Sequence, residues 1–224
     1  MTELEAIKAR HSVRAYQEKP IEAGALAKLN EMVGECNRRG NLHLQVLPDS
    51  GGLFSNPFCM VSGLSRAPAA VACVGPDDET LDERVGYWGE RLVLFAQTLG
   101  LNTCWVGMCS KGRSHADIRP GEKMLLAIAL GYGKDDGKPR SSKTPEQVSR
   151  AEGEAPEWFR LGVEAALLAP TAMNQQKFFF TLKGDGTVLS KAGKGICSKL
   201  DLGIVRYHFD VAAAAAGRPA GAWH

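Results

Sequence analysis

The chain has 224 residues, with 27 Lys and Arg against 25 Asp and Glu, so its formal net charge is +2. Hydrophobic residues make up 44% and charged residues 23%, which is ordinary globular composition. A charge of +2 excludes a nucleic-acid binder whose whole surface is basic, and the even spread of apolar residues excludes large-scale disorder. We expect one domain over residues 1–224 that needs neither a disulfide nor a structural metal.

Cysteine usage and the N-terminus indicate the compartment. The six cysteines form no Cys-x-x-Cys pair, and no histidine cluster completes a zinc set, so we expect reduced thiols and no metal. The N-terminal residues 1–5 are acidic and polar, whereas a signal peptide is basic and then apolar. No uncharged apolar stretch approaches the ~20 residues of a membrane span. We therefore expect a cytoplasmic protein with no membrane partner.

Hydrophobic periodicity predicts alternating helices and strands. In chain order we expect a short helix opening at Thr2, a helix over about 22–38, strands over 41–47 and 69–74, a helix over 80–100, and strands over 103–106 and 124–130. A Glu three residues after Thr2 and after Thr80 predicts a capping box at each helix start. Gly86 and Gly89 cost the longest helix about 1 kcal/mol each against Ala, which indicates close packing against another backbone.

The last part of the chain begins with a polar segment over 134–154, which we expect to be an exposed loop or arm. Beyond it we expect a helix over 156–168, a hairpin of strands 177–182 and 187–189 turning at 184–186, and a helix over 198–217. This order predicts an α+β or α/β fold. The helix and strand over 157–182 parallel those over 22–47, a faint internal repeat that would divide the domain into 1–150 and 151–216.

Most catalytic motifs are absent. Gly131-x-Gly133-x-x-x-Gly137 follows a predicted strand, but its spacing is wrong for a dinucleotide fingerprint and no helix follows it. There is no Walker A motif and no Gly-x-Ser-x-Gly elbow. His43, His115, His208 and His224 stand apart from any carboxylate or cysteine at ligand spacing, so we expect each to be a structural or surface histidine.

Two segments carry more specific signals. Arg10-His11-Ser12-Val13-Arg14 places two guanidinium groups four residues apart with a hydroxyl between them, a pattern suited to phosphate oxygens, although a solvated basic turn would give the same sequence. Ala169-Pro170-Thr171-Ala172-Met173-Asn174-Gln175-Gln176 places three carboxamides in a row between a helix and an apolar strand. Such amides are costly to bury unless a partner uses them, and a heteroaromatic ring offers matching polar edges.

These segments resemble the FMN-dependent nitroreductases, and the resemblance extends over most of the chain. The matching segments are 10–14, Gly86-Tyr87-Trp88-Gly89-Glu90-Arg91-Leu92 with 99–107, the strand 126–133 ending in Leu-Gly-Tyr, Ser142-Lys143-Thr144-Pro145-Glu146, and the loop 169–176. Together they are similar to a subgroup in which the Asn/Gln loop lies toward the C-terminus. The resemblance implies an α+β fold, with a central mixed sheet flanked by helices, and FMN bound in a cleft.

The resemblance also implies a set of flavin contacts. They are Arg10, His11, Ser12, Arg14, Val106, Gly107, Met108, Arg140, Lys143, Pro170, Thr171 and Asn174. The segment 10–14 would hold the phosphate and the pyrimidine side, and 106–108 would present backbone N–H groups near flavin N5 and O4. Arg140 or Lys143 would add positive charge at the phosphate. Asn174 would touch the ring from the opposite wall, whereas Gln176 would be dispensable for binding.

The loop position departs from the usual family pattern. In ordinary members the Asn loop follows the first helix pair and reaches the flavin across a dimer interface. Here that place holds 48–52, and the Asn loop comes only at 169–176. One polypeptide would then supply both walls of the site, which leaves monomer and homodimer open.

The function we expect from this resemblance is an FMN-dependent oxidoreductase. It would pass electrons from NADH or NADPH to a small nitroaromatic, quinone or similar acceptor. The flavin carries the chemistry, so no side chain is assigned as nucleophile, acid or base. The alternatives are a non-catalytic flavin-binding or ligand-sequestering protein on the same scaffold, and a structural domain without flavin.

Overall fold

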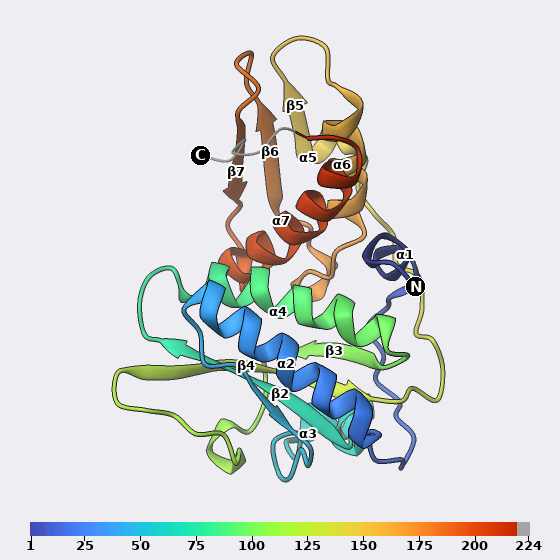
Figure 1. The fold of residues 1–224 in the computed structure, drawn as a ribbon, viewed down its shortest axis with the longest axis vertical. Helices are drawn as coiled ribbons and strands as arrows, with labels where there is room; N and C mark the ends of the chain where they lie inside the picture. The colour runs from blue at the N-terminus through green and yellow to red at the C-terminus, as the bar shows by residue number, and fades with distance from the viewer. Residues whose placement is uncertain (219–224) are drawn as a thin grey trace.

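The computed structural model describes residues 1–218 and has two sheets, one in each half of the fold, with helices packed between and around them (Figure 1). The helices are α1 (Glu3–Ala9), α2 (Ala23–Gly40), α3 (Pro57–Ser62), α4 (Leu81–Thr98), α5 (Pro145–Val148), α6 (Glu157–Leu167) and α7 (Ser198–Ala215). The strands are β1 (Gln45–Leu47), β2 (Ala69–Pro76), β3 (Asn102–Val106), β4 (Glu122–Gly131), β5 (Ser149–Ala151), β6 (Phe178–Leu182) and β7 (Val188–Ala192). The predicted α+β class is confirmed.

The larger sheet has the strand order β1-β2-β4-β3, and each neighbouring pair is antiparallel. Alternate residues of β2 face opposite sides, as the pleat requires. Val71 and Cys73 face the main core, which also contains residues of α2 and α4, whereas Ala70 and Ala72 face a second core with Tyr16. Both faces are therefore covered, which explains why β2 and β4 read as nearly continuous apolar runs.

The smaller sheet has the order β5-β6-β7, with β5 parallel and β7 antiparallel to β6. It packs against α7, which also packs against α6 and crosses α4 between the two halves (Figure 1). This crossing is close: a Cβ on Gly86 would lie 2.1 Å from the carbonyl oxygen of Leu200, and one on Gly203 would lie 2.1 Å from that of Glu83. The close backbone packing predicted for Gly86 is confirmed, whereas Gly89 instead makes room for the ring of Trp105.

Four sequence expectations need correction. The strand predicted over 41–47 is confined to β1, because Asn41 ends α2 in a left-handed conformation with φ of 48°. The capping box at Thr80 is wrong, since its N–H and hydroxyl both donate to Asp78 Oδ1 at 2.8 Å. The segment 134–154 is not all loop, because it contains α5 and β5. Helix α3 was not predicted.

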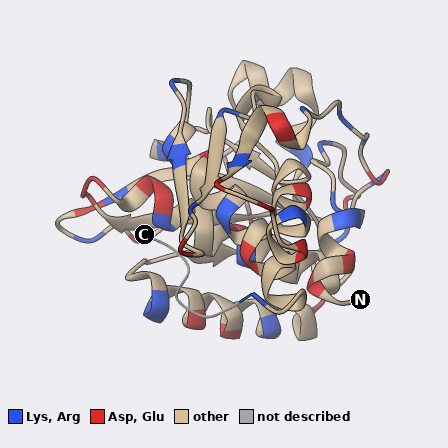
Figure 2. Ribbon diagram, turned by 90° about the horizontal axis from the view of Figure 1, so that it is seen from above, with Lys and Arg blue, Asp and Glu red and all other residues tan. Residues whose placement is uncertain are grey.

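Two local expectations are met. The capping box at Thr2 is confirmed, and all six cysteines are free thiols. Lys and Arg residues intermingle with Asp and Glu over the molecule (Figure 2), as the charge of +2 suggests. Among residues 1–218, none of the helices has the length and apolar character needed to cross a bilayer. The same residues contain no group of three or more His, Cys, Asp or Glu that could hold a metal ion.

Candidate functional site

The segment that follows α1 lies against the larger sheet. Ser12 forms a parallel bridge with Thr103 on β3, and Tyr16 forms an antiparallel bridge with Gly133, just after β4. The Tyr16 hydroxyl, fully buried, donates to the carbonyl oxygen of Val13 at 2.9 Å. The basic turn 10–14 is therefore a fixed part of the fold.

A cavity of about 410 Å³ opens beside this turn. Its lining residues come from segments far apart in the sequence: Ser12, Arg14, Ala15, Ser62, Asp135, Gly137, Lys138, Arg140, Pro170, Thr171, Met173 and Asn174. Half of the residues predicted from the family resemblance are in this set. The charged lining residues are the cations Arg14, Lys138 and Arg140 and the carboxylate Asp135, so the cavity has an excess of positive charge.

Two guanidinium groups lie near one another at this site: that of Arg10 is buried and that of Arg140 is half-buried. Arg10 is only 3% exposed, and its Nη2 donates to Ser12 Oγ at 3.3 Å. Burial lowers the pKa of Arg10, and attraction to Glu90 opposes this effect. Arg140 Nη2 donates to the carbonyl oxygens of Leu168 and Ala169, just past the end of α6. Burial and then the positive charge of Arg10 lower the pKa of Arg140 to about 10.

Buried polar atoms without a hydrogen-bond partner concentrate at this site, in the part of the chain that the structure describes. Five of the eight such atoms belong to residues of the basic turn, Arg140 and the loop 169–176: Nε and Nη1 of Arg10, Nδ1 of His11, Nε of Arg140 and Oδ1 of Asn174. An unsatisfied buried polar group costs about 1–3 kcal/mol, so such a cluster is unfavourable unless a ligand uses it. All of these residues were predicted as flavin contacts.

The carboxylate of Glu90 attracts both guanidinium groups but is hydrogen-bonded to other residues. Glu90 Oε1 lies 2.8 Å from His208 Nε2, and both side chains are fully buried. Attraction to Glu90 raises the pKa of Arg10 and of Arg140, but burial outweighs it and leaves both pKa values lowered.

The loop 169–176 is joined to the segment around Arg140. Asn174 Nδ2 donates to the carbonyl oxygen of Ser141 at 2.8 Å. Gln176, 2% exposed, accepts from the Lys143 N–H at 2.8 Å and donates to the carbonyl oxygen of Leu167 at 3.0 Å. Lys143 Nζ donates to the Gln176 carbonyl oxygen at 2.7 Å. Lys143 and Gln176 therefore hold the two segments together and do not line the cavity.

The predicted contacts at 106–108 lie at the end of β3, outside this cavity's lining. Val106 is buried, while Gly107 and Met108 are exposed. The Met108 carbonyl oxygen accepts from Asn56 Nδ2 at 2.7 Å, and Asn56 also caps α3 through the Cys59 N–H. The role of 106–108 stays a prediction.

Sequence reasoning missed several lining residues. Asp135 and Lys138 belong to the segment expected to be an exposed loop, and Ser62 ends the unpredicted α3. The one available signal was Gly137: its φ is +77°, and a Cβ there would lie 2.7 Å from His11 Cβ. A glycine at that point lets the segment after β4 approach the basic turn.

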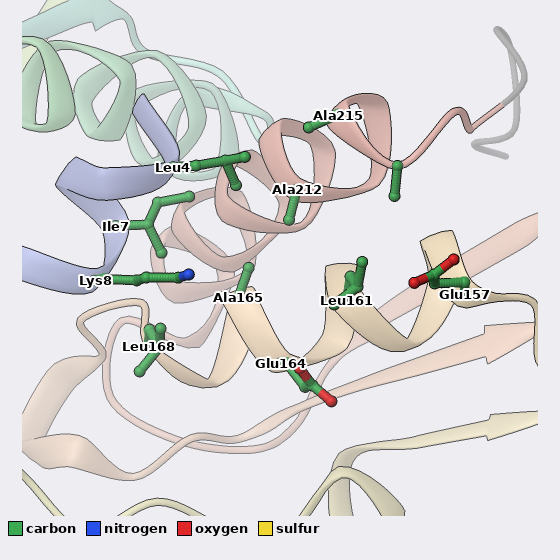
Figure 3. A pocket seen from close by; sticks show the side chains of 11 residues that line it. Leu4, Ile7, Lys8, Glu157, Leu161, Glu164, Ala165, Leu168, Ala212 and Ala215 are labelled. Carbon is green, nitrogen blue, oxygen red and sulfur yellow. The ribbon is translucent and has the colours of Figure 1, made fainter. Parts of the chain in front are cut away.

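A second cavity, of about 460 Å³, lies between α1, α6 and α7 (Figure 3). Its lining is mostly apolar, with Lys8, Glu157 and Glu164 as its charged residues. Among the described residues, no buried polar side-chain atom without a partner belongs to this lining. We therefore place the functional site at the cavity beside the basic turn.

The fold and site define an α+β protein with an open cavity whose charged lining is mostly cationic. Over residues 3–213 the chain matches the model of a family described as "Putative TM nitroreductase". Because this match covers nearly the whole chain, the protein belongs to that family of nitroreductases, which are oxidoreductases. The resemblance found in the sequence motifs is confirmed at the level of the family.

Solved structures show the same fold. A "putative nitroreductase" from Thermotoga maritima is 21% identical, covers 96% of this chain and 85% of its own, and superposes with a TM-score of 0.68. A "Putative NADH dehydrogenase/NAD(P)H nitroreductase" from Parabacteroides distasonis is 19% identical over 65% of this chain and 95% of its own, with a TM-score of 0.50. A "Putative NADH Oxidase" from Clostridium acetobutylicum is 20% identical, covers 64% of this chain and 96% of its own, and superposes with a TM-score of 0.50. No curated protein matches the chain.

Proposed function

We propose that this protein is an FMN-dependent oxidoreductase that passes electrons from NAD(P)H to a small nitroaromatic, quinone or similar acceptor. The observation that carries the proposal is the pair of guanidinium groups of Arg10, which is buried, and Arg140, which is half-buried and lines the cavity of about 410 Å³. Each has a buried N–H group without a partner. Two neighbouring cations removed from water are unfavourable alone, and a phosphate between them would supply both charge and acceptors.

The residues present fit a flavin mononucleotide. Arg10 and Arg140 would hold the terminal phosphate, with Ser12 and Arg14 beside them. Asn174 Oδ1, buried and without a partner, would accept from a ring N–H. One cationic cluster suits one terminal phosphate, and the chain lacks a dinucleotide fingerprint, which favours FMN over FAD.

When bound, the flavin would supply reversible acceptance of hydride from the nicotinamide. The protein's own groups would bind and orient it. The cations Arg14, Lys138 and Arg140 at the cavity would favour added negative charge there. Exposed Met173 at the rim lies where an acceptor would approach.

One chain supplies both walls in this proposal. Residues of the turn 10–14, of the segment 135–140 and of 170–174 in one chain all line the cavity. The site therefore does not need a second subunit to bring Asn174 to the ring, and both a monomer and a homodimer are compatible with it.

The test is a flavin titration followed by anaerobic reduction. Protein given an equimolar mixture of FMN and FAD should become yellow and, after removal of unbound flavin, should release FMN and not FAD on heating, as measured by mass spectrometry. Bleaching by NADPH or NADH without oxygen, followed by recovery of the colour with a nitroaromatic, would support the enzyme. Binding without bleaching would support the non-catalytic alternative. Failure to bind excess FMN would overturn the proposal.

A further inference from the structure

The loop that carries Asn174 has an unusual backbone. Met173, Asn174 and Gln176 have φ values of 51°, 53° and 45°, all in the left-handed region. Residues with a Cβ rarely adopt this region, and Met, unlike Asn, gains nothing locally from it. Three such residues within four positions need an outside group to hold them.

Asp201, in the first turn of α7, supplies that group. Its Oδ1 and Oδ2 accept from the Ala172 N–H at 2.9 and 3.1 Å, and Oδ2 also accepts from Gln175 Nε2 at 2.9 Å. These contacts fall on either side of Met173 and Asn174, so the carboxylate clamps both ends of the left-handed stretch.

Asp201 makes its side-chain hydrogen bonds to the loop and not to α7. Among the described residues, the N-cap Cys197 makes no side-chain capping hydrogen bond, and Asp201 is 2% exposed, with both oxygens accepting from the loop. Burial raises the pKa of Asp201, while the hydrogen bonds from Gln175 and Ala172 act in the opposite direction. A buried carboxylate is costly, and its contacts to the loop and its place in the first turn of α7 offset that cost.

Gln175 completes the clamp from the other side. Its Nε2 donates to the Ile196 carbonyl oxygen at 2.6 Å, and a Cβ on Gly195 would lie 2.3 Å from its Oε1. The segment before α7 therefore makes room for the Gln175 amide and holds it beside Asp201.

We propose that Asp201 is a positioning residue that fixes the loop 171–176 so that Asn174 faces the flavin. This inference rests on the proposed function for its flavin part, whereas the clamp itself can be measured without flavin. Asp201 does not line the cavity and so acts through Asn174.

The test compares Asp201→Asn with Asp210→Asn in the full chain. Asn keeps the shape of Asp201 and can still accept from the Ala172 N–H, but its amide then meets Gln175 Nε2 donor to donor. Asp210 lies on the same helix and accepts from the Tyr87 hydroxyl at 2.8 Å, so it controls for losing a helix carboxylate. Gln175→Ala removes the same contact from the loop side and serves if Asp201→Asn does not fold.

Two readouts are needed. Hydrogen–deuterium exchange of peptides covering 171–176, without flavin, should accelerate on the order of tenfold in Asp201→Asn and Gln175→Ala, because a charge-assisted hydrogen bond is lost. The Kd for FMN should rise by a similar factor in both variants. Asp210→Asn should change neither.

Each other outcome overturns the inference. Unchanged exchange in both clamp variants would show that Asp201 does not hold the loop. Accelerated exchange with unchanged FMN affinity would show that the loop does not position Asn174. If the unmutated protein does not bind FMN, the proposed function fails and the flavin role of Asp201 fails with it, while exchange still reports whether the clamp exists.

Discussion

Arg10 should oppose folding and favour cofactor binding. Arg10→Met should therefore keep or raise the free energy of unfolding without flavin, and should lower the affinity for FMN. Met keeps most of the length of the side chain but removes the charge and the N–H groups. In the protein without flavin, Nε and Nη1 of Arg10 are buried without partners. Among the described residues, its side chain makes one hydrogen bond, to Ser12, which is long at 3.3 Å.

The magnitude follows from these contacts. Replacing a buried, poorly compensated charge by an apolar side chain of similar volume is commonly neutral or stabilising by about 1–4 kcal/mol. We expect the free energy of unfolding without flavin to stay level or to rise within that range. A hydrogen bond to a charged group contributes roughly 1.5–3 kcal/mol, so the Kd for FMN should rise roughly 10- to 150-fold.

The assay is chemical denaturation of the protein without flavin, and flavin titration at two salt concentrations. Higher salt should weaken binding to the unmutated protein more than to Arg10→Met, since the contact is partly electrostatic. Turnover at saturating FMN should stay close to that of the unmutated protein. Arg160→Met, on the exposed side of α6, is the matched control and should leave FMN affinity unchanged.

Two results would refute this reasoning. Loss of stability in Arg10→Met with unchanged affinity would make Arg10 a structural group. Unchanged affinity with collapsed turnover would place Arg10 in the chemistry.

Four further outcomes are expected. Asn174→Gly keeps the left-handed backbone and removes the amide, so the Kd for FMN should rise roughly 5- to 150-fold by titration, from about 1–3 kcal/mol for a buried unsatisfied partner; an unchanged Kd would remove Asn174 from the site. Gln176→Ala should lower the free energy of unfolding by about 1–3 kcal/mol, because the Lys143 N–H and the Leu167 carbonyl oxygen lose a buried partner; its direct effect on FMN should be smaller than that of Asn174→Gly. Gly86→Ala should lower the free energy of unfolding by about 1–3 kcal/mol through overpacking. A Cβ on Gly24 would have no atom within 4 Å, so Gly24→Ala should raise the free energy of unfolding by about 0.4–1 kcal/mol in the same denaturation assay. Burial raises the pKa of Glu122, but hydrogen bonds from Arg119 and His43 outweigh it and leave the pKa lowered. Ionised Glu122 therefore stabilises the folded protein above its unfolded pKa. The difference in free energy of unfolding between the unmutated protein and Glu122→Gln should disappear as the pH falls through the folded pKa.

The regular elements could be predicted because their signals are local. Helix α4 shows its apolar stripe within a few turns, and the turn at 184–186 separates β6 from β7 as expected. Where the prediction failed, a neighbouring contact decided the outcome. Asn41 takes the left-handed conformation that ends α2, and Asp78 accepts the hydrogen bonds of Thr80 that a capping box would have used.

The candidate site could be predicted only in part, because some of its residues are brought together by the fold and not by closeness in the sequence. The turn 10–14 and the loop 169–176 were found because their residue types are close together in sequence. Asp135 and Lys138 were missed because only the fold brings them to Arg14. Asp201 was missed because its partners lie near residue 172 on another element, and a lone Asp at a helix start has a simpler local interpretation.

The buried polar groups that lack hydrogen-bond partners gather at one place in the fold, and this placement supports the proposed function. The core is otherwise well satisfied: buried Glu90 bonds both Trp105 and His208, and Gln176 has its amide occupied at both ends. At one place the fold instead keeps buried Arg10 beside half-buried Arg140, and the charge of Arg10 lowers the pKa of Arg140. Arg140 donates to the carbonyl oxygens of Leu168 and Ala169, but folding alone gains little from the buried charge of Arg10, because an apolar side chain would fit the same space at lower cost. A bound dianion would convert both penalties into charge-assisted contacts, and this is why we assign the cavity to the phosphate of a flavin and expect binding to stabilise the fold.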